Sequence, residues 1–392
     1  MLKIQNQSKA LVLFFSLILT SCATGRLIIN SPEDNIRKQP NEIPSFTIYA
    51  LGDAGETNNQ SRAVLEQLSL VTASNQAPSM VIFLGDNIYP HGMPPESNIE
   101  GYQRAQDILM NQINSLSSFK GEIVFIPGNH DWNGLKPGGI DFIRRESEYF
   151  DQLQQPNLSF IPENGCGGPV PIILNKDLVM LIIDSQWWIK DWTKEPRINE
   201  GCSINTREEF IKSFREEVAL HKGKQIVVAM HHPLYTEGTH GGHFSIQNHL
   251  FPLTKLVKWF YLPLPVLGSL YFYLRSGIGH PQDVKSPRYN SLKDALIKDL
   301  GYNGDLIFLA GHEHCLQYLT VDGDHFLVSG SGSKQTAIAN SKDLVYGHKA
   351  AGFMELNFYK DNMVWLSVYE VDPGTKASNI VLSRPIIESD KK

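Results

Sequence analysis

The sequence is poor in cysteine, with four in 392 residues, which excludes a small scaffold held by many disulfides. It also lacks an excess of positive charge. Lys and Arg total 35 against 41 Asp and Glu, and the net charge of −6 offers no general attraction for nucleic acid. The charged fraction of 19% and the hydrophobic fraction of 42% argue against a disordered or fibrous chain. Histidine stands out, because several of its 13 residues are clustered and imidazole is the commonest metal ligand.

The first apolar run, residues 10–20 (ALVLFFSLILT), is too short to span a membrane and has the length of a signal-peptide core. It ends in LTSC, which resembles the lipobox of bacterial lipoproteins, where the cysteine becomes the lipidated first residue. The resemblance implies a signal peptide over residues 1–21, a lipid on Cys22 and, because Ala23 follows, attachment to the outer membrane on its periplasmic or surface side. An ordinary cleaved signal with an incidental cysteine is the alternative.

Two of the remaining cysteines are candidates for a disulfide. Cys166 and Cys202 lie 36 positions apart in loops rich in Gly and Asn, and an exported protein can oxidise such a pair. Closing this loop would stabilise the fold by roughly 3–4 kcal/mol. Cys315 lies beside a histidine cluster and is a poor candidate for a structural bridge.

Short apolar runs rich in β-branched residues, each bounded by Gly, Pro or a polar residue, predict buried strands. They cover residues 46–51, 80–84, 122–126, 178–183, 225–230 and 306–310. Helical periodicity over 62–70 and 208–221, between such runs, predicts an α/β core. Further runs near the C-terminus predict a second, antiparallel sheet in the same domain. These runs cover residues 326–329, 352–359, 363–371 and 380–384.

The strand ends carry Asp, Asn or His, and ligands of α/β sheets bind beyond the carboxyl ends of strands. We therefore expect these loops to converge on one site. Five clusters carry the pattern: Asp53-Ala-Gly, residues 85–89 (GDNIY), 128–131 (GNHD), 231–233 (HHP) and 311–314 (GHEH). A single Asp after a strand is more often a helix cap, but all five in order at strand ends are not explained that way.

In this order, the clusters resemble the five motifs of the calcineurin-like metallophosphoesterases, over about residues 45–335. The generic pattern begins with D-x-H, but here Gly55 stands at the position of that histidine. A tyrosine, Tyr89, follows three residues after the second Asp. Both departures together are typical of the purple acid phosphatase branch, in which the tyrosine supplies the missing ligand.

The resemblance implies a four-layer α/β fold of two packed mixed sheets flanked by helices, and two metal ions. Phenolate and carboxylate suit Fe(III), whereas imidazole and amide suit a divalent Zn, Fe or Mn ion. The Fe(III) ligands would be Asp53, Asp86, Tyr89 and His314. The divalent ligands would be Asp86, which bridges, with Asn129, His231 and His312. His232 has no ligand position in this pattern, so we expect it to lie behind the ligands or to face the substrate.

The implied reaction is hydrolysis of a phosphomonoester, a phosphorylated small molecule, by a metal-bound hydroxide. By the same resemblance, His130 would contact the phosphate and His240 would protonate the leaving oxygen. A phosphodiesterase acting on a nucleotide or a lipid-linked phosphate is the alternative reaction. A binding lipoprotein with a vestigial site is the alternative of another class, against which the complete ligand set argues.

The expected organisation is a signal peptide over 1–21, a flexible polar tether over 22–44 and a catalytic domain over 45–385. An insert over 250–290 contains a run of 24 largely apolar residues, 251–274, interrupted by three prolines and two lysines that disfavour a membrane-spanning helix. It is expected either to cover the core as a packed helical hairpin or to expose an aromatic surface to a bilayer or an acyl substrate.

Overall fold

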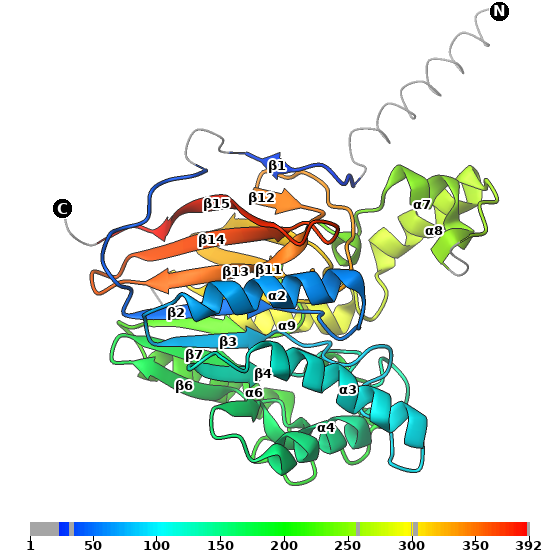
Figure 1. Ribbon diagram of the computed structural model, residues 1–392. Coiled ribbons are helices and arrows are strands. Elements are labelled where there is room, and N and C mark those ends of the chain that lie inside the picture. The colour runs from blue at the N-terminus through cyan, green and yellow to red at the C-terminus, as the bar shows by residue number, and fades with distance from the viewer. Residues whose placement is uncertain (1–22, 31–34, 256–258, 299, 301–304, 390–392) are drawn as a thin grey trace, which may run out of the picture.

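The apolar strand segments assemble into two β-sheets in the computed structural model, which describes residues 23–30, 35–255, 259–298, 300 and 305–389 (Figure 1). Within these residues, a seven-stranded sheet has the order β15-β14-β13-β2-β3-β4-β5. Its strands are β2 Phe46–Leu51, β3 Ser79–Phe83, β4 Glu122–Phe125, β5 Leu158–Phe160, β13 Ala351–Phe358, β14 Val364–Val371 and β15 Ser378–Ile387.

The second sheet has eight strands in the order β1-β12-β10-β11-β9-β8-β7-β6. Its strands are β1 Ile28–Ile29, β6 Val170–Asn175, β7 Leu178–Ile182, β8 Gln225–Ala229, β9 Ile307–Ala310, β10 Leu316–Val321, β11 Asp324–Ser329 and β12 Leu344–His348. Each sheet contains four neighbouring parallel strands, which are β2-β3-β4-β5 in the first sheet, where β5 is an edge strand, and β7-β8-β9-β11 in the second. The remaining strands pair antiparallel.

The prediction that the C-terminal strands form a sheet of their own was wrong. Strands β13, β14 and β15 extend the first sheet antiparallel, because β13 pairs with β2 from Met354 opposite Ala50 to Phe358 opposite Phe46. Strand β11 instead joins the second sheet beside β9. Each C-terminal strand was recognisable from its own residues, but its partner strand was not. Strands β2 and β13, for example, pair although they lie about 300 residues apart in the sequence.

The two sheets pack face to face over a core built from alternate strand residues. In β2, Ile48 and Ala50 face the opposite sheet, whereas Tyr49 and Leu51 belong to the hydrophobic cluster under the helices. Strands buried on both faces read as continuous apolar runs, which explains why these segments lack polar alternation. The result is the expected four-layer arrangement of helices, sheet, sheet and helices (Figure 1).

Helices complete the outer layers. They are α2 Asn59–Ala73, α3 Ile99–Ser115, α4 Gly139–Leu153, α5 Ser185–Ile189, α6 Arg207–Leu220 and α9 Pro287–Ile297. The predicted helices over 62–70 and 208–221 correspond to α2 and α6, and both begin at a capping box that satisfies free N–H groups of the first turn. Short 3₁₀ turns lie at Glu163–Gly165, Trp192–Lys194 and Thr239–Gly241.

The segment before the first long strand lies along the domain surface. Ala23 is buried and bridges to Ser245, and β1 pairs with β12. Further along, Ile36 bridges to Ser383 on β15. The described part of residues 22–44 therefore differs from the flexible tether that its polar composition predicts, because its backbone groups bond to the edges of the sheets.

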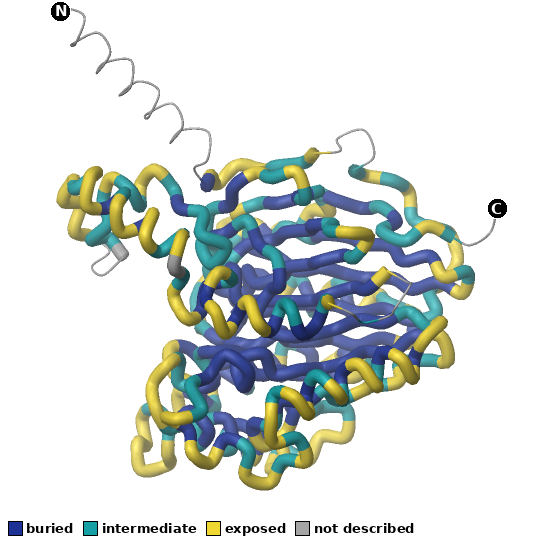
Figure 2. Tube along the Cα trace, turned by 180° about the vertical axis from the view of Figure 1, so that it is seen from behind, coloured by how far each residue is buried: buried dark blue, intermediate teal, exposed yellow. Residues whose placement is uncertain are grey.

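The described residues 246–255 and 259–278 of the insert form a unit that projects from the side of the domain, and we call this unit the arm. It contains α7 (Ile246–Leu250), a 3₁₀ turn (Pro252–Lys255) and α8 (Pro265–Ile278), and it stands clear of both sheets (Figures 1 and 2). It does not cover the core, so the first of the two expectations for this insert was wrong. Within the described residues, no helix combines the length and apolar character needed to cross a membrane.

A disulfide joins Cys166 and Cys202, with an S–S distance of 2.01 Å. The pair predicted from the sequence is therefore bonded in the structure. Cys315 is free and buried, and its sulfur accepts a hydrogen bond from the Gln317 side chain. Cys22, the predicted lipidation site, lies outside the described residues.

Candidate metal centre

The polar clusters meet at the carboxyl ends of the central strands of both sheets. Asp53 follows β2, Asp86 follows β3 and Asn129 follows β4, whereas His231 follows β8 and His312 follows β9. Asp53, Asp86 and His312 adopt positive φ angles of 58°, 55° and 65°, a conformation that costs free energy for residues with a side chain. The tight turns aim these side chains back over the ends of their strands.

Tyr89 is the centre of the first group of donor atoms. Its hydroxyl oxygen lies 2.9 Å from Asp53 Oδ1, 2.9 Å from Asp86 Oδ2 and 3.2 Å from His314 Nε2. His314 Nε2 is also 3.3 Å from Asp53 Oδ1. The four residues that the sequence predicts as Fe(III) ligands are therefore brought together around one point.

The second group contains Asp86, Asn129, His231 and His312. His231 Nε2 lies 3.1 Å from Asn129 Oδ1, 3.4 Å from Asp86 Oδ1 and 3.2 Å from His312 Nδ1. Asp86 therefore faces the first group through Oδ2 and the second through Oδ1. The structure thus brings together all four residues predicted for the divalent site, with the shared carboxylate between the two groups.

Backbone carbonyl groups orient the two histidines of the second group. His231 Nδ1 donates to the carbonyl oxygen of Leu84 at 2.7 Å, which directs Nε2 toward Asn129 and Asp86. His312 Nε2 donates to the carbonyl oxygen of Gln282 at 3.0 Å, and burial lowers the pKa of His312 far below its usual value, so Nδ1 carries a lone pair. One nitrogen of each ring therefore points to the same place as the Asn129 amide oxygen and an Asp86 carboxylate oxygen. A cation at this place would be bound by all four atoms.

The donor spacing fits metal coordination. Atoms bound about 2.1 Å from one cation lie about 3.0–3.4 Å apart at octahedral or tetrahedral angles. The distances within the two groups run from 2.9 to 3.4 Å. The residues therefore fit two adjacent metal ions, the first with hard anionic oxygens and the second with imidazole and amide donors.

Burial sets the protonation of the isolated ligands. It raises the pKa of Asp53 to about 7 and that of Tyr89 well above its usual value, so their anionic forms need a nearby positive charge. Burial also lowers the pKa of His314 to about 4 and that of His312 far below its usual value. Both imidazoles are therefore neutral near pH 7, which is the form that binds metal.

Two buried residues support the ligands from behind. His232 is bonded through both ring nitrogens, at 2.8 Å to Ser185 Oγ and at 2.6 Å to Gln282 Oε1, so neither is free for a metal. Asp131 accepts backbone N–H groups from Asn87, Ile88 and Gly128 and thereby ties the loop after β4 to the loop after β3. Such contacts orient metal ligands without touching the metal.

His130 lies at the open side of the first group, with its side chain 34% exposed. Its Nδ1 donates to the carbonyl oxygen of Pro90 at 2.7 Å, and its Nε2 lies 3.9 Å from Asp86 Oδ2. The ring packs edge-on against Tyr89. A bound phosphate could therefore meet Nε2, which is consistent with the role that the sequence predicts.

His240 lies on the other side, its ring 4.0 Å from the ring of His312. Its Nδ1 is 3.0 Å from Asp283 Oδ1, and Asp283 is held in turn by two hydrogen bonds from Arg275, at 2.7 and 2.8 Å. Burial would lower the pKa of His240, but the Asp283 hydrogen bond and the charge of Glu313 raise it instead. A histidine held in this way can carry a proton.

Sequence reasoning missed several residues that complete the site. Gln282 and Asp283 follow the apolar insert and contact His312 and His240, although nothing in their local pattern marks them. Lys334 lies in the loop after β11, with its ammonium 3.1 Å from the centre of the Tyr89 ring. Gln282 and Asp283 do follow an apolar segment, but many surface loops have polar residues at such a place, so this pattern does not identify a functional site.

Comparisons with known proteins agree with this geometry. The family described as Calcineurin-like phosphoesterase matches residues 46–316. Purple acid phosphatase 17 of Arabidopsis thaliana is 20% identical over 358 residues, covering 88% of this chain and 86% of that protein.

Two solved structures share the fold. GAP50, the anchor in the inner membrane complex of Plasmodium, matches with a TM-score of 0.52 at 11% identity, covering 88% of this chain and 90% of that one. PhoD matches with a TM-score of 0.53 at 10% identity, covering 88% of this chain and 72% of that one. At these identities, the two structures bear on the fold alone.

Proposed function

The chain belongs to the calcineurin-like phosphoesterase family and is a metal-dependent phosphoester hydrolase, and we propose that it hydrolyses phosphomonoesters at a binuclear centre of the purple acid phosphatase type. The observation that carries this proposal is the position of the Tyr89 hydroxyl, within 3.2 Å of Asp53, Asp86 and His314. A buried phenol whose hydroxyl oxygen meets two carboxylates and an imidazole is suited to Fe(III), and the second group suits Zn, Fe or Mn.

Gly55 explains why tyrosine, and not a histidine two residues after Asp53, supplies the ligand. A Cβ atom at Gly55 would lie 2.5 Å from the carbonyl oxygen of Asp86 and 2.7 Å from that of Asn87. The absence of a side chain lets the loop after β3 lie against Gly55, and the Tyr89 N–H donates to the Gly55 carbonyl oxygen at 2.9 Å. Gly55 therefore allows the close backbone packing that places Tyr89 at the site.

When bound, the two metals would activate a water molecule and neutralise charge on the phosphoryl oxygens. Asp86 would be the ligand that both metals share, because its Oδ2 faces Tyr89 and its Oδ1 faces His231. His130 presents Nε2 toward a phosphate at the open side, and Lys334 adds positive charge beside Tyr89. His240, oriented by Asp283, would give its proton to the leaving oxygen.

The test combines metal analysis, a visible spectrum and a substrate panel on the purified protein. We expect iron with a second metal, a visible Tyr–Fe(III) absorption band that Tyr89→Phe abolishes, and turnover of simple monoesters above that of bis-nitrophenyl diesters, nucleotides and phospholipids. His231→Ala should abolish turnover, whereas His348→Ala, on β12 beside Glu370, should not. A colourless protein with two zinc ions would refute the iron assignment, and a preference for diesters would refute the monoesterase.

We also propose that the protein is an exported lipoprotein, held by a lipid on Cys22 in the outer membrane. The LTSC motif after a short apolar run supports this, and so does the Cys166–Cys202 disulfide, because such bonds persist in oxidising compartments. Cells fed an alkyne-labelled fatty acid should label the parent protein but not Cys22→Ser. Label that persists in the variant would contradict the lipid assignment.

A further inference from the structure

The arm exposes an unusual amount of apolar surface. On α8, six side chains are each more than half exposed: Val266, Leu267, Leu270, Tyr271, Tyr273 and Leu274. Trp259, in the turn before α8, is 78% exposed, and Tyr261 is also largely exposed. Water-facing surfaces rarely gather so many large apolar side chains, and a contiguous patch of this kind marks a contact site.

The apolar residues of α8 lie on its outward side. With about 3.6 residues per turn, positions 266, 267, 270, 271, 273 and 274 fall within an arc of about 160°. Phe272 lies on the opposite side, where it is buried against Phe244 with the ring centres 4.3 Å apart. Gly268 faces α7 so closely that a Cβ atom would lie 2.3 Å from the carbonyl oxygen of His249. The inward side therefore holds the arm together, and the outward apolar residues are free for another contact.

The arm also differs in charge from the rest of the protein. Residues 244–282 contain no Asp or Glu but include Lys255 and Lys258, although the whole chain has a net charge of −6. The third basic residue of this range, Arg275, is paired with Asp283 and does not add to this positive charge. Exposed Trp and Tyr side chains beside basic residues are the composition of segments that lie in the interface of a bilayer. Anionic headgroups complement this charge, whereas the arm of a second copy carries the same positive charge and does not.

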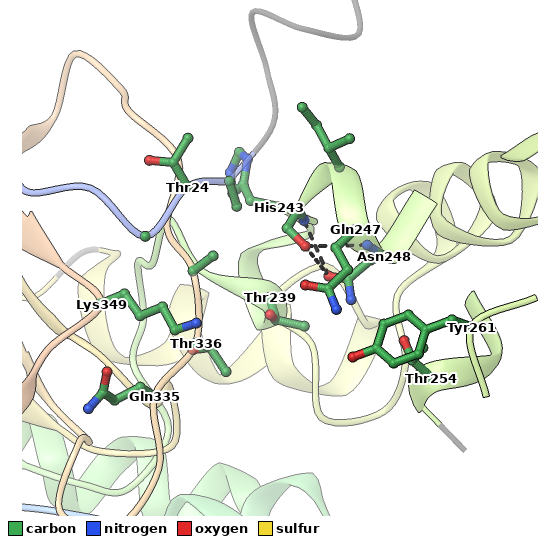
Figure 3. Close-up of a pocket in the computed structure, with 15 residues that line it drawn as sticks. Thr24, Thr239, His243, Gln247, Asn248, Thr254, Tyr261, Gln335, Thr336 and Lys349 are labelled. Carbon is green, nitrogen blue, oxygen red and sulfur yellow. Dashed lines mark hydrogen bonds between the residues drawn. The ribbon is translucent and has the colours of Figure 1, made fainter. Parts of the chain in front are cut away.

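The start of the described chain lies at the base of the arm. Ala23, the residue after Cys22, donates its N–H to the carbonyl oxygen of Phe244 at 3.2 Å and bridges to Ser245. A cavity of about 660 Å³ opens at this junction, lined by residues of the N-terminal segment, the arm and the domain, including Thr24, His243 and Tyr261 (Figure 3). A lipid on Cys22 would therefore be attached one residue away from this junction.

We propose that the outward face of the arm docks into the interface of an anionic lipid bilayer. Docking would also hold the metal centre near the membrane surface, because the segments that precede and follow the arm contact the site. The chain enters the arm just after His240, and it leaves the arm at Gln282 and Asp283, which contact His312 and His240. The inference does not depend on which phosphoester the site hydrolyses.

The test uses the full chain and vesicles of phosphatidylcholine with phosphatidylglycerol, containing a lipid with a spin-label quencher on its acyl chain. Trp259 reports on the arm, and its share of the fluorescence is the difference between the parent and Trp259→Phe. We expect this share to be quenched by the vesicles. Quenching measures the position of the arm itself, so attachment of the chain through its N-terminus does not mimic the result.

The key variant replaces Leu267, Leu270 and Leu274 together with Glu. It should lower the quenching of Trp259 by roughly tenfold, because charged side chains resist transfer into the apolar region. The matched control replaces three exposed apolar residues of the domain with Glu and should behave as the parent. Its positions are Leu70, Ile99 and Leu220.

Equal quenching of the parent and the arm variant, or of the parent and Trp259→Phe, would overturn the proposal. Equal quenching with phosphatidylcholine alone would overturn the choice of an anionic surface. Sedimentation without lipid checks the other occupant. A second copy would be shown to cover this face by two results together: a dimer of the parent that dissociates when Leu267, Leu270 and Leu274 are substituted, and no quenching of Trp259 by the vesicles.

Discussion

Replacing Gly55 with alanine tests the link between the missing histidine and Tyr89. The added Cβ atom would lie 2.5 Å from the Asp86 carbonyl oxygen, whereas ordinary contact begins at 3.4 Å. The difference, 3.4 − 2.5, means that the loop after β3 must move by about 0.9 Å. Its neighbour atoms belong to backbone rather than to flexible side chains, so the strain cannot be relieved by a rotamer change.

This movement displaces the residue that both metal sites share. Asp86 is wholly buried and held by the His130 N–H at 2.8 Å as well as by Tyr89. A misplacement of about 1 Å in a catalytic group can lower turnover about 10²-fold. Overpacking of this kind also costs about 1–3 kcal/mol of stability. We therefore expect Gly55→Ala to lower kcat about 100-fold and to bind less than the full complement of metal.

The assay measures kcat on a nitrophenyl monoester, metal content per chain and the free energy of unfolding. Gly277→Ala is the matched control, because a Cβ atom at Gly277 on α8 would meet nothing within 4 Å. Alanine favours a helix over glycine by about 1 kcal/mol, so this control should be as stable as the parent or more so. Near-normal kcat and metal content in Gly55→Ala would refute the reasoning.

Three further predictions concern the surroundings of the site. Asp283→Asn removes the carboxylate that orients His240. The kcat should fall about tenfold or more for alkyl monoesters, whose leaving oxygen needs a proton, and much less for nitrophenyl phosphate. Equal losses on both substrates would contradict a proton-donor role for His240. Cys202→Ala opens a loop closed over 36 residues, and urea unfolding should show a loss of about 4 kcal/mol, equal to the effect of reducing the parent with its Cys166 bond. Burial raises the pKa of Asp184 from 3.8 to about 7, so its contribution to stability is full below pH 4 and is lost as the pH rises through 7. Thermal unfolding of Asp184→Asn between pH 4 and 8 should lack this decline, and an unchanged pH profile would show that other groups cause it.

Local sequence patterns were sufficient to locate the strands and the chemistry at their ends. The run from Phe46 to Leu51 was predicted with the bounds that the strand has in the structure, because a strand buried on both faces is apolar throughout. Gly55 and Tyr89 were recognised together as the two differences from the generic motif pattern, and the structure shows the close backbone contact that links them. These features depend on residues close in sequence or on motifs with fixed spacing.

The sequence did not reveal the partners that come from distant segments. Strand β13 is apolar enough for either sheet, and only the free edge of β2 decides where it pairs. Asp283 has no local mark of function, because its role arises from the path of the arm, which returns the chain to His240. In the same way, the composition of residues 22–44 indicates flexibility, whereas the sheet edges that receive β1 exist only in the folded domain.

The five motifs in their order were therefore enough to identify a metal-dependent phosphoesterase by resemblance, whereas the shortage of cysteine and of basic charge only excluded other classes of protein. The tertiary structure decided which ring nitrogens of His231 and His312 face each other, which carboxylate holds His240 and which way the arm projects. The reason is physical: hydrophobic periodicity and turn residues act along the chain, whereas burial, tautomers and exposed surface depend on what packs against each residue. An apolar segment such as 251–274 reads the same whether it fills a core or stands in solvent, and only the fold shows that its outward face is uncovered.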